Sequence, residues 1–321
     1  MKQKALVGWD LGREGRCDAR SRVGRSILAV AAALVAVTAA SAASAYCRTT
    51  ICPQCDNGPD GCPSGLPIIW PTSCVTFTMQ YGASKQIDLV RATEVMDNAF
   101  AVWQQADCGD GTPPAIHIDH RFGTAACTLH EYNQTDSNAN IIMFRDEVWP
   151  YEGSANVLGL TTVTYSRKTG NIFDVDMEIN ATQHLSVEDP IPPTAYDLQS
   201  ILTHEAGHFL GMAHSNVNTA TMWWQYTSGS DSFRELDPDD VEGICAVYAP
   251  STPMQCDPNP RQGFSAECGV FPSGEGGICT IARVGVSHER SDGYGWLGVV
   301  GAVAAAGVAR RGRRRSQAEG R

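Results

Sequence analysis

Hydrophobic positions along the chain repeat with two different periods, which predict strands in some segments and helices in others. Residues 75–79 alternate apolar and polar side chains, as expected of a half-buried strand. After Ser84 the apolar residues fall on one helical face: Leu89, Ala92, Met96, Ala99, Phe100 and Trp103. A strand followed by a helix is therefore predicted here. Residues 116–120 and 140–144 have the apolar content of further strands.

Residues 158–165 and 172–179 predict a β-hairpin, because a polar segment that ends in Gly170 and Asn171 separates them. In the second arm, apolar side chains alternate with Asp174, Asp176 and Glu178, which puts the three carboxylates on one face. Two interpretations are open at this point. The acidic face is either a solvated surface of the sheet, or it supplies oxygen ligands to Ca²⁺.

Two further helices are predicted from their starting residues. The first is expected to begin near Thr194, because Thr194 and Asp197 have the spacing of a capping box and the prolines before them prevent an earlier start. The second is expected to have Asp237 as N-cap and Pro238 at its first position, with apolar residues at helical spacing as far as Tyr248.

Both ends of the chain differ from the rest. Basic residues, an apolar run over residues 27–40 and small residues at 43–45 predict a signal peptide over residues 1–45. An apolar run over residues 296–309, followed by an arginine cluster, is typical of a surface anchor or of a disordered basic tail. Between them we expect a Cys-rich lead-in over residues 46–67, a catalytic domain over 68–250 and a Pro/Gly-rich linker over 251–278.

The composition favours an exported protein. The formal net charge is −11, and many of the arginines lie in the two end segments, so the part between them is more acidic still. This charge argues against nucleic acid as a partner. Of the twelve cysteines, Cys17 lies in the signal segment and Cys279 in the tail, and the even number that remains predicts disulfides. Four of the rest lie close enough together for a zinc knot as well, although export favours disulfides: Cys47, Cys52, Cys55 and Cys62.

Residues 204–214 hold three imidazoles and one carboxylate that a single metal ion could use. On a helix, His204 and His208 lie on one face, with Glu205 beside them. Gly211 can adopt a backbone conformation that ends the helix and returns His214 as a third nitrogen ligand. Three protein ligands leave the fourth position of Zn²⁺ open, which is typical of a catalytic site. We therefore expect one catalytic Zn²⁺ on the three histidines, with Glu205 as general base.

With these residues the chain resembles the metzincin metallopeptidases, and within them the matrixin-like family, over roughly residues 68–250. The segment from His204 to His214 matches the family's zinc motif at every defining position, and Ser215 directly after it is typical of matrixins. Met222 fits the family's Met-turn, in which a methionine lies under the zinc without binding it. Residues 279–321 resemble a C-terminal sorting tail of the MYXO-CTERM type, which directs a protein to the cell surface.

The resemblance implies an α+β metzincin fold: a twisted, mostly parallel sheet with an antiparallel edge strand, two long helices and a C-terminal helix. It implies that residues 158–165 form the edge to which a peptide substrate adds as an antiparallel strand, and that residues 170–178 bind ions. Phe173 stands where a vertebrate-type matrixin offers histidine, which argues against a second, structural zinc. The family's latency motif is absent, and residues 62–65 are only a faint echo of it.

The function expected from the sequence is zinc-dependent hydrolysis of peptide bonds by a secreted or surface-anchored monomer that acts on proteins or peptides. Its side-chain preference is expected to depend on the loop over residues 223–234, after the Met-turn. The alternative is a surface-displayed binding or adhesion protein that keeps the fold without turnover. Glu205 argues against that alternative, because zinc binding alone does not require this carboxylate.

Overall fold

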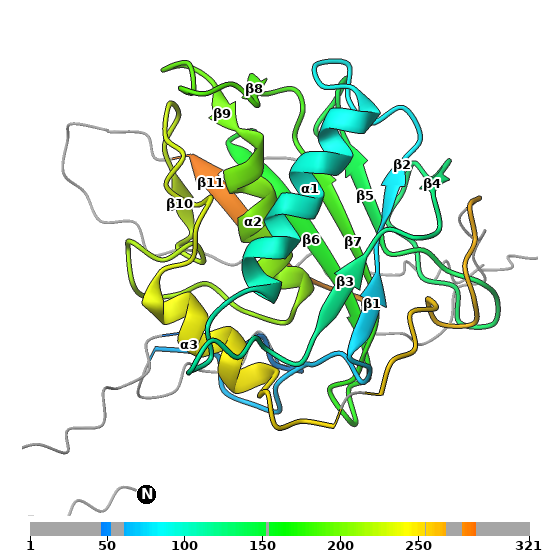
Figure 1. The fold of residues 1–321 in the computed structure, drawn as a ribbon. Helices are drawn as coiled ribbons and strands as arrows, with labels where there is room; N and C mark the ends of the chain where they lie inside the picture. The colour runs from blue at the N-terminus through cyan, green and yellow to red at the C-terminus, as the bar shows by residue number, and fades with distance from the viewer. Residues whose placement is uncertain (1–45, 53–60, 152–153, 254, 268–277, 287–321) are drawn as a thin grey trace, which may run out of the picture.

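The structure is a computed structural model that describes residues 46–52, 61–151, 154–253, 255–267 and the backbone of 278–286 (Figure 1). The predicted signal peptide and the apolar part of the predicted tail lie outside these residues. In the described part of the chain, no helix has the length and apolar character needed to cross a membrane.

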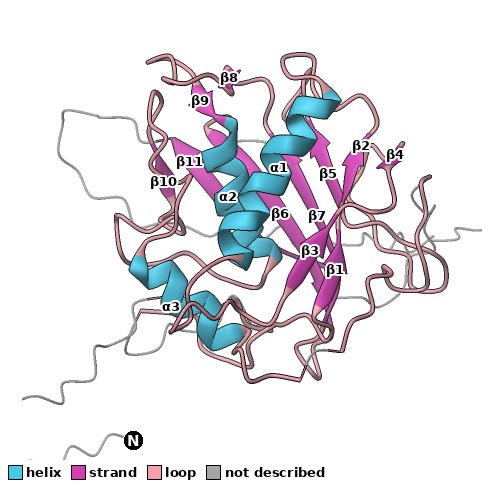
Figure 2. Cartoon of the chain, viewed as in Figure 1, coloured by secondary structure: helices cyan, strands magenta, loops and turns pink. Residues whose placement is uncertain are grey.

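A mixed sheet of seven strands, with two helices in front of it in this view, organises the fold (Figure 2). Its order is β10-β11-β6-β7-β5-β2-β4. β2 pairs in parallel with β4 and β5, and β5 pairs in parallel with β7. β6 is antiparallel to both β7 and β11, whereas β10 is parallel to β11. The strands are β2 (Thr78–Gln80), β4 (Thr124–Ala125), β5 (Ile141–Phe144), β6 (Val157–Tyr165), β7 (Ile172–Ile179), β10 (Gln225–Tyr226) and β11 (Ile278–Val286).

Two small parallel sheets accompany the main one, formed by β1 (Cys74–Thr76) with β3 (His117–Asp119) and by β8 (Leu185–Ser186) with β9 (Tyr196–Asp197). The single strand predicted over residues 75–79 is divided at Phe77, because β1 pairs with β3 while β2 pairs with β4 and β5. The other predicted strands lie within one or two residues of their expected positions.

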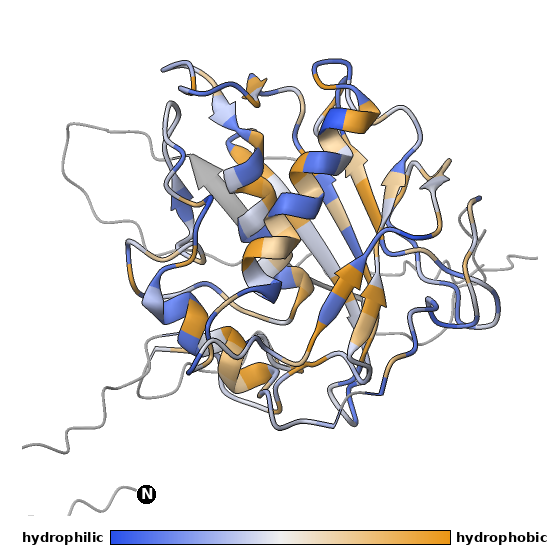
Figure 3. Cartoon of the chain, viewed as in Figure 1, coloured by the Kyte–Doolittle hydropathy of each residue, from blue (hydrophilic) through white to orange (hydrophobic). Residues whose placement is uncertain are grey.

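The helices α1 (Leu89–Gln104) and α2 (Leu198–Phe209) pack against each other, and α2 also contacts β6 and β7. Of the apolar face predicted for α1, Ala92, Met96, Ala99, Phe100 and Trp103 are buried, and Leu89 is partly buried. Figure 3 shows hydrophilic and hydrophobic stretches alternating along α1, as expected of a helix with one buried face.

The predicted start of α2 is wrong by one turn. Its N-cap is Asp197, whose side chain accepts a hydrogen bond from the Ser200 amide, and the helix begins at Leu198. Thr194 lies in the turn before β9, so it cannot cap the helix. By contrast, α3 (Pro238–Val247) begins as predicted, with Asp237 as N-cap in a capping box with Asp240.

The α+β fold class is confirmed: a mostly parallel sheet with one antiparallel hairpin, two long helices and a C-terminal helix. The predicted edge strand is β6, but β11 and β10 lie beyond it in the sheet. β11 spans the boundary predicted between linker and tail.

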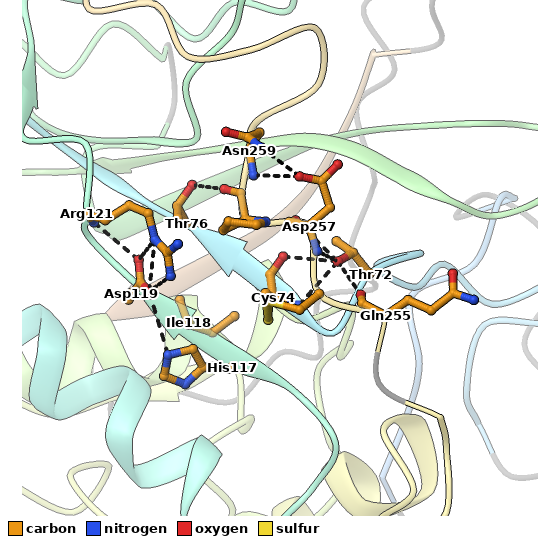
Figure 4. Close-up of a disulfide and its surroundings, with 12 residues drawn as sticks. Thr72, Cys74, Thr76, His117, Ile118, Asp119, Arg121, Gln255, Asp257 and Asn259 are labelled. Atoms are coloured by element: carbon orange, nitrogen blue, oxygen red, sulfur yellow. Dashed lines mark hydrogen bonds and ion pairs between the residues drawn. A yellow bond between two sulfur atoms is a disulfide. The ribbon is translucent and has the colours of Figure 1, made fainter.

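Disulfides tie distant segments together. They join Cys47 to Cys62, Cys74 to Cys256, and Cys108 to Cys245. Cys52 and Cys127 are also disulfide-bonded. Three of the four cysteines considered for a zinc knot are thus in disulfides, and the fourth, Cys55, lies outside the described residues. Figure 4 shows how the Cys74–Cys256 bridge fixes the first part of the predicted linker alongside β1. There Thr76 Oγ1 donates to the Pro258 carbonyl at 2.8 Å, and the Ser73 amide donates to the Gln255 carbonyl at 3.0 Å.

Candidate metal centre

The C-terminal half of α2 and the loop after it carry the three predicted metal ligands. His204 and His208 are one turn apart on the helix and fully buried. The chain then turns at Gly211, whose φ is +90° and where a Cβ would lie 2.9 Å from the Ile68 carbonyl oxygen. Only glycine accepts that conformation and that close approach without strain. The turn returns His214 toward the other two histidines.

The three imidazoles converge. One ligand atom from each lies within 4.8 Å of the others, and in the described part of the chain this is the only group of three or more such residues placed to hold a metal ion. The Nε2 atoms of His204 and His208 are 3.1 Å apart. His204 Nδ1 donates to the Thr221 carbonyl at 2.6 Å, and His208 Nδ1 donates to the Met212 carbonyl at 2.9 Å. These hydrogen bonds select the tautomers whose Nε2 lone pairs point into the shared space.

Burial also prepares the imidazoles chemically. It lowers the pKa of His214 to about 4, and it lowers the pKa values of His204 and His208 well below their usual range. All three rings are therefore neutral at pH 7, the form that binds a metal. His214 Nε2 is buried without a hydrogen-bond partner. An orphaned nitrogen beside two inward-facing ones fits a tetrahedral Zn²⁺ site with one open position.

Glu205 lies between α2 and β6. Its Oε2 accepts a hydrogen bond from Thr161 Oγ1 at 2.5 Å, while Oε1 is buried without a partner. Burial raises the pKa of Glu205 to about 8, against the opposing effect of the Thr161 hydrogen bond. A bound dication beside it would favour the carboxylate form. Gly159 of β6 leaves the space that Glu205 fills, since a Cβ there would lie 2.8 Å from the Glu205 Cδ.

Met222 is buried close beneath the histidine-bearing turn of α2. A Cβ at Gly207 would collide with Met222 Sδ, so Gly207 provides the space for the methionine. The Met222 carbonyl accepts from the Ser215 amide at 2.8 Å, which ties the Met-turn to the residue after His214. The assignment of Met222 to a Met-turn stays a prediction.

The acidic residues in the first turn of α3 reach back to the metal centre. Asp240 accepts the backbone N–H groups of Thr221 at 2.7 Å and of Met222 at 3.1 Å. Asp239 accepts the Ser215 hydroxyl at 2.6 Å. The helix therefore fixes the Met-turn and the residue after His214.

The N-terminal lead-in packs against the turn that carries His214. The Thr49 amide donates to the Gly211 carbonyl at 3.0 Å, and the Ala213 amide donates to the Cys47 carbonyl at 2.9 Å. Cys62 is bonded to Cys47, so it has no free thiolate to block a zinc ion. The faint latency motif is therefore not a cysteine switch.

The three acidic residues of β7 are buried, so the interpretation of a solvated sheet face is wrong. Asp176 accepts the backbone N–H groups of Ile141 and Glu131, at 3.1 and 2.7 Å. Asp174 Oδ1 has no partner, and burial raises its pKa well above the usual range. That orphaned carboxylate oxygen suits a cation, but the carboxylates do not converge as the histidines do. Calcium binding by these residues stays a prediction.

Glu178, the third acidic residue of β7, has its own partners. Arg145 Nε donates to Glu178 Oε1 at 2.6 Å, the Tyr151 hydroxyl donates to Oε2, and His130 Nδ1 lies 3.2 Å from Oε2. Burial alone would raise the pKa of Glu178, but these contacts outweigh it and hold that pKa below its usual range.

Several residues of the site were not predicted from the sequence. Glycine and threonine at alternate positions of a strand give no sign that both will face Glu205, and two aspartates at a helix start are explained by the helix dipole alone. The missed residues are Gly159, Thr161, Gly207, Asp239 and Asp240.

Known proteins resemble this chain over the region that contains the three histidines. The family model described as Matrixin matches residues 69–249. Human neutrophil collagenase is 26% identical over 202 residues, which cover 59% of this chain and 38% of the collagenase. Metalloendoproteinase 2-MMP of Arabidopsis thaliana is 29% identical over 180 residues, which cover 56% of this chain and 42% of the relative. Metalloendoproteinase 5-MMP of the same plant is 47% identical, over only 55 residues. The chain thus spans less than half the length of these relatives.

Proposed function

Because the chain belongs to the matrixin family over residues 69–249, we propose that it is a zinc-dependent endopeptidase that acts outside the cell. The observation that carries the proposal is the convergence of His204, His208 and His214 beside a buried carboxylate, Glu205, that has one free oxygen. Both are needed for peptide hydrolysis, whereas a binding protein needs neither.

The three histidines would hold the catalytic zinc through their Nε2 atoms. Zinc bound there would supply Lewis acidity, which activates water and polarises the carbonyl of the peptide bond. The Thr221 and Met212 carbonyls keep two of the rings in the required tautomer. Family membership makes zinc the expected metal, and calcium an expected additional ion.

Glu205 would act as the general base and then as the general acid. Its Oε1 has no hydrogen-bond partner, so it is free to take a proton from water, while Thr161 holds Oε2 in place. The same proton then goes to the leaving amine nitrogen as the C–N bond breaks. Thr161 is a positioning residue here, because it acts through Glu205.

The organisation around the catalytic domain is part of the proposal. Residues 1–45 would be a signal peptide, 46–67 a disulfide-stapled lead-in, 68–250 the catalytic domain, 251–278 a linker and 279–321 a sorting or anchoring tail. Disulfide-bonded cysteines support export, because disulfides persist in oxidising compartments. Proteins or peptides are the proposed substrates, and a monomer is the proposed state.

The loop after the Met-turn would select the substrate side chain. Within it, Trp223, Gln225, Tyr226, Ser230 and Phe233 line one pocket. Phe233 stacks on His204 with 6.0 Å between ring centroids, so the pocket adjoins the metal ligands. Cleavage-site profiling on a peptide library would define the preference.

Replacing Glu205 by glutamine tests the function most directly. Glu205→Gln keeps the shape and the three histidines but removes the base, so we expect about one zinc per chain and at least a ~10³-fold loss of casein or gelatin hydrolysis. Metal analysis and a protease assay, each with and without a chelator, measure the two effects.

The matched control is Glu94→Gln, on the exposed side of α1, which should retain full activity. A wild-type chain that binds zinc yet shows no chelator-sensitive cleavage would favour the alternative of a binding protein. Normal activity in Glu205→Gln would contradict the proposed mechanism.

A further inference from the structure

The strand β11 lies between β10 and β6 in the main sheet. It pairs antiparallel with β6 along most of its length, from Ile278 opposite Thr164 to Gly285 opposite Val157. Its last two residues pair in parallel with β10. Figure 1 shows β11, in orange, between β10 and β6. A segment that follows the catalytic domain in the sequence therefore returns to the sheet.

Both neighbouring strands, β6 and β10, carry residues of the site already described. β6 carries Gly159 and Thr161, which contact Glu205. β10 follows three residues after Met222, and its Tyr226 packs against Phe233 at 5.0 Å between ring centroids. β11 also contacts α2, the helix that bears the catalytic residues. The segment thus occupies the edge that β6 would otherwise present, next to the helix that carries the metal ligands.

The direction of β11 is that of a bound substrate. An extended peptide that adds to a sheet edge is held by backbone hydrogen bonds, largely independent of its side chains. The edge of β6 has a single row of N–H and C=O groups, so β11 and an external peptide cannot both use it. We therefore treat β11 as a peptide already seated on the substrate-binding edge.

The register places one residue of β11 closest to the catalytic carboxylate. Ala282 pairs with Thr161 and Val284 with Gly159, and these two partners are the β6 residues that contact Glu205. Arg283 lies between them, opposite Leu160. The two peptide bonds of Arg283 are therefore the bonds nearest to the catalytic group along the strand.

We propose that the segment Ile278–Val286 is an intramolecular substrate, and that the chain hydrolyses it once, in cis, at a peptide bond of Arg283. This inference rests on the proposed function. Water adds across the amide: its hydroxyl group joins the carbonyl carbon, its proton joins the amine nitrogen, and the C–N bond breaks without any redox change. Hydrolysis separates the catalytic domain from everything after the cut, including the predicted anchoring tail. It also removes the part of β11 after the cut from the β6 edge, while the residues of β11 before the cut stay attached to the catalytic domain.

The first experiment compares full-length wild type with Glu205→Gln. Each chain is produced without other proteases and followed by intact mass and by N-terminal sequencing of the released fragment. We expect wild type to lose its C-terminal segment from Arg283 or Val284 onward, and Glu205→Gln to remain intact. The rate constant in wild type should not change over a 100-fold dilution, because the reaction is intramolecular. Casein hydrolysis is measured in the same samples.

The second experiment changes the backbone of β11 alone. Arg283→Pro removes one N–H group and fixes φ at a value that disfavours a central strand, so self-cleavage should slow at least tenfold. Casein hydrolysis should be unchanged or faster, because the β6 edge is easier to reach. The matched control is Ser291→Pro, beyond the end of β11, which should cut itself at the wild-type rate.

The outcomes separate this inference from the proposed function. Wild type that digests casein but stays intact over residues 278–286 overturns self-cleavage and leaves the function standing. A rate proportional to chain concentration overturns the intramolecular route, and an equally cut Glu205→Gln assigns the cleavage to another protease. A chain that cleaves neither casein nor itself contradicts both.

Discussion

At the scale of single residues, the site depends on two glycines that leave room for neighbouring side chains. Glu205 occupies space that exists because residue 159 is glycine, and Met222 occupies space that exists because residue 207 is glycine. Neither glycine has the positive φ that would explain it as a turn residue. Close approach of a neighbouring side chain therefore explains glycine at both positions.

Gly159→Ala tests that interpretation. The new Cβ would lie 2.8 Å from the Glu205 Cδ, so the carboxylate must move or the strand must shift. We expect kcat/KM for a peptide substrate to fall about 10²-fold, because an ångström-scale displacement of a catalytic group has effects of that size. The free energy of unfolding should fall by about 1–3 kcal/mol, the range for overpacking.

The control is Thr162→Ala, three residues along β6 and on its opposite face, which should leave catalysis within about twofold of wild type. Zinc content should be unchanged in both variants, since neither position contacts a histidine. Wild-type activity in Gly159→Ala would show that Glu205 tolerates the displacement.

At the scale of elements, Asp197 fixes the start of α2 and joins it to the loop after the Met-turn. Its carboxylate accepts the Ser200 amide at 3.0 Å and a pair of hydrogen bonds from Arg234, at 2.8 and 2.9 Å. Asp197 is fully buried, whereas Asp88, which caps α1 in the same way through the Arg91 amide, is exposed.

Comparison of Asp197→Ala with Asp88→Ala separates the contribution of the helix cap from that of the pairing with Arg234. Loss of an exposed cap costs about 1 kcal/mol. Loss of a buried cap that also pairs with the partly buried Arg234 should cost about 3–5 kcal/mol, because the guanidinium loses its carboxylate partner. Urea unfolding, in the inactive Glu205→Gln background to prevent autolysis, measures both. Equal costs would mean that Arg234 finds other partners in solvent.

Local patterns predicted most elements, because helix caps, hairpin turns and the spacing of the zinc motif act over a few residues. The convergence of His204, His208 and His214 was predictable for that reason. The start of α2 was not, since Thr194 and Asp197 are both acceptable caps and only pairing of β9 with β8 and of Asp197 with Arg234 decides between them. The roles of Thr161 and Asp240 depend on packing between elements far apart in the sequence, which no local pattern records.

At the scale of the whole molecule, buried charged groups make the free energy of unfolding depend on pH. Glu178 is fully buried between Arg145 and Tyr151, and its pKa lies below the value it would have in the unfolded chain. As pH falls, the unfolded chain therefore takes up a proton at this group before the folded chain does. The stability that Glu178 contributes is present above about pH 4.5 and is lost as pH falls through its lowered folded pKa.

Glu178→Gln should show this dependence as a difference from wild type. At pH 7 we expect the variant to be less stable by about 2 kcal/mol, the size of a hydrogen bond to a charged group. The difference should shrink as pH falls below about 4.5 and through the lowered pKa of folded Glu178, as wild type loses its own contribution. Urea unfolding at fixed zinc and calcium concentrations measures it, again in the Glu205→Gln background.

The control for acid sensitivity is Glu94→Gln, which removes an exposed pair with Arg91 and should change stability by less than about 1 kcal/mol at every pH. A Glu178→Gln difference that stays constant with pH would contradict the assignment of the lowered pKa to Glu178.

The Cys74–Cys256 bridge closes a covalent ring of chain that contains α1, α2, α3 and all three histidines. One cut anywhere inside that ring leaves two pieces still joined, so a nicked molecule migrates as intact protein on a non-reducing gel and divides only after reduction. A cut at Arg283 falls outside the ring, which places no covalent restraint on the fragment beyond it. Electrophoresis with and without reductant therefore distinguishes accidental damage to the domain from its own processing.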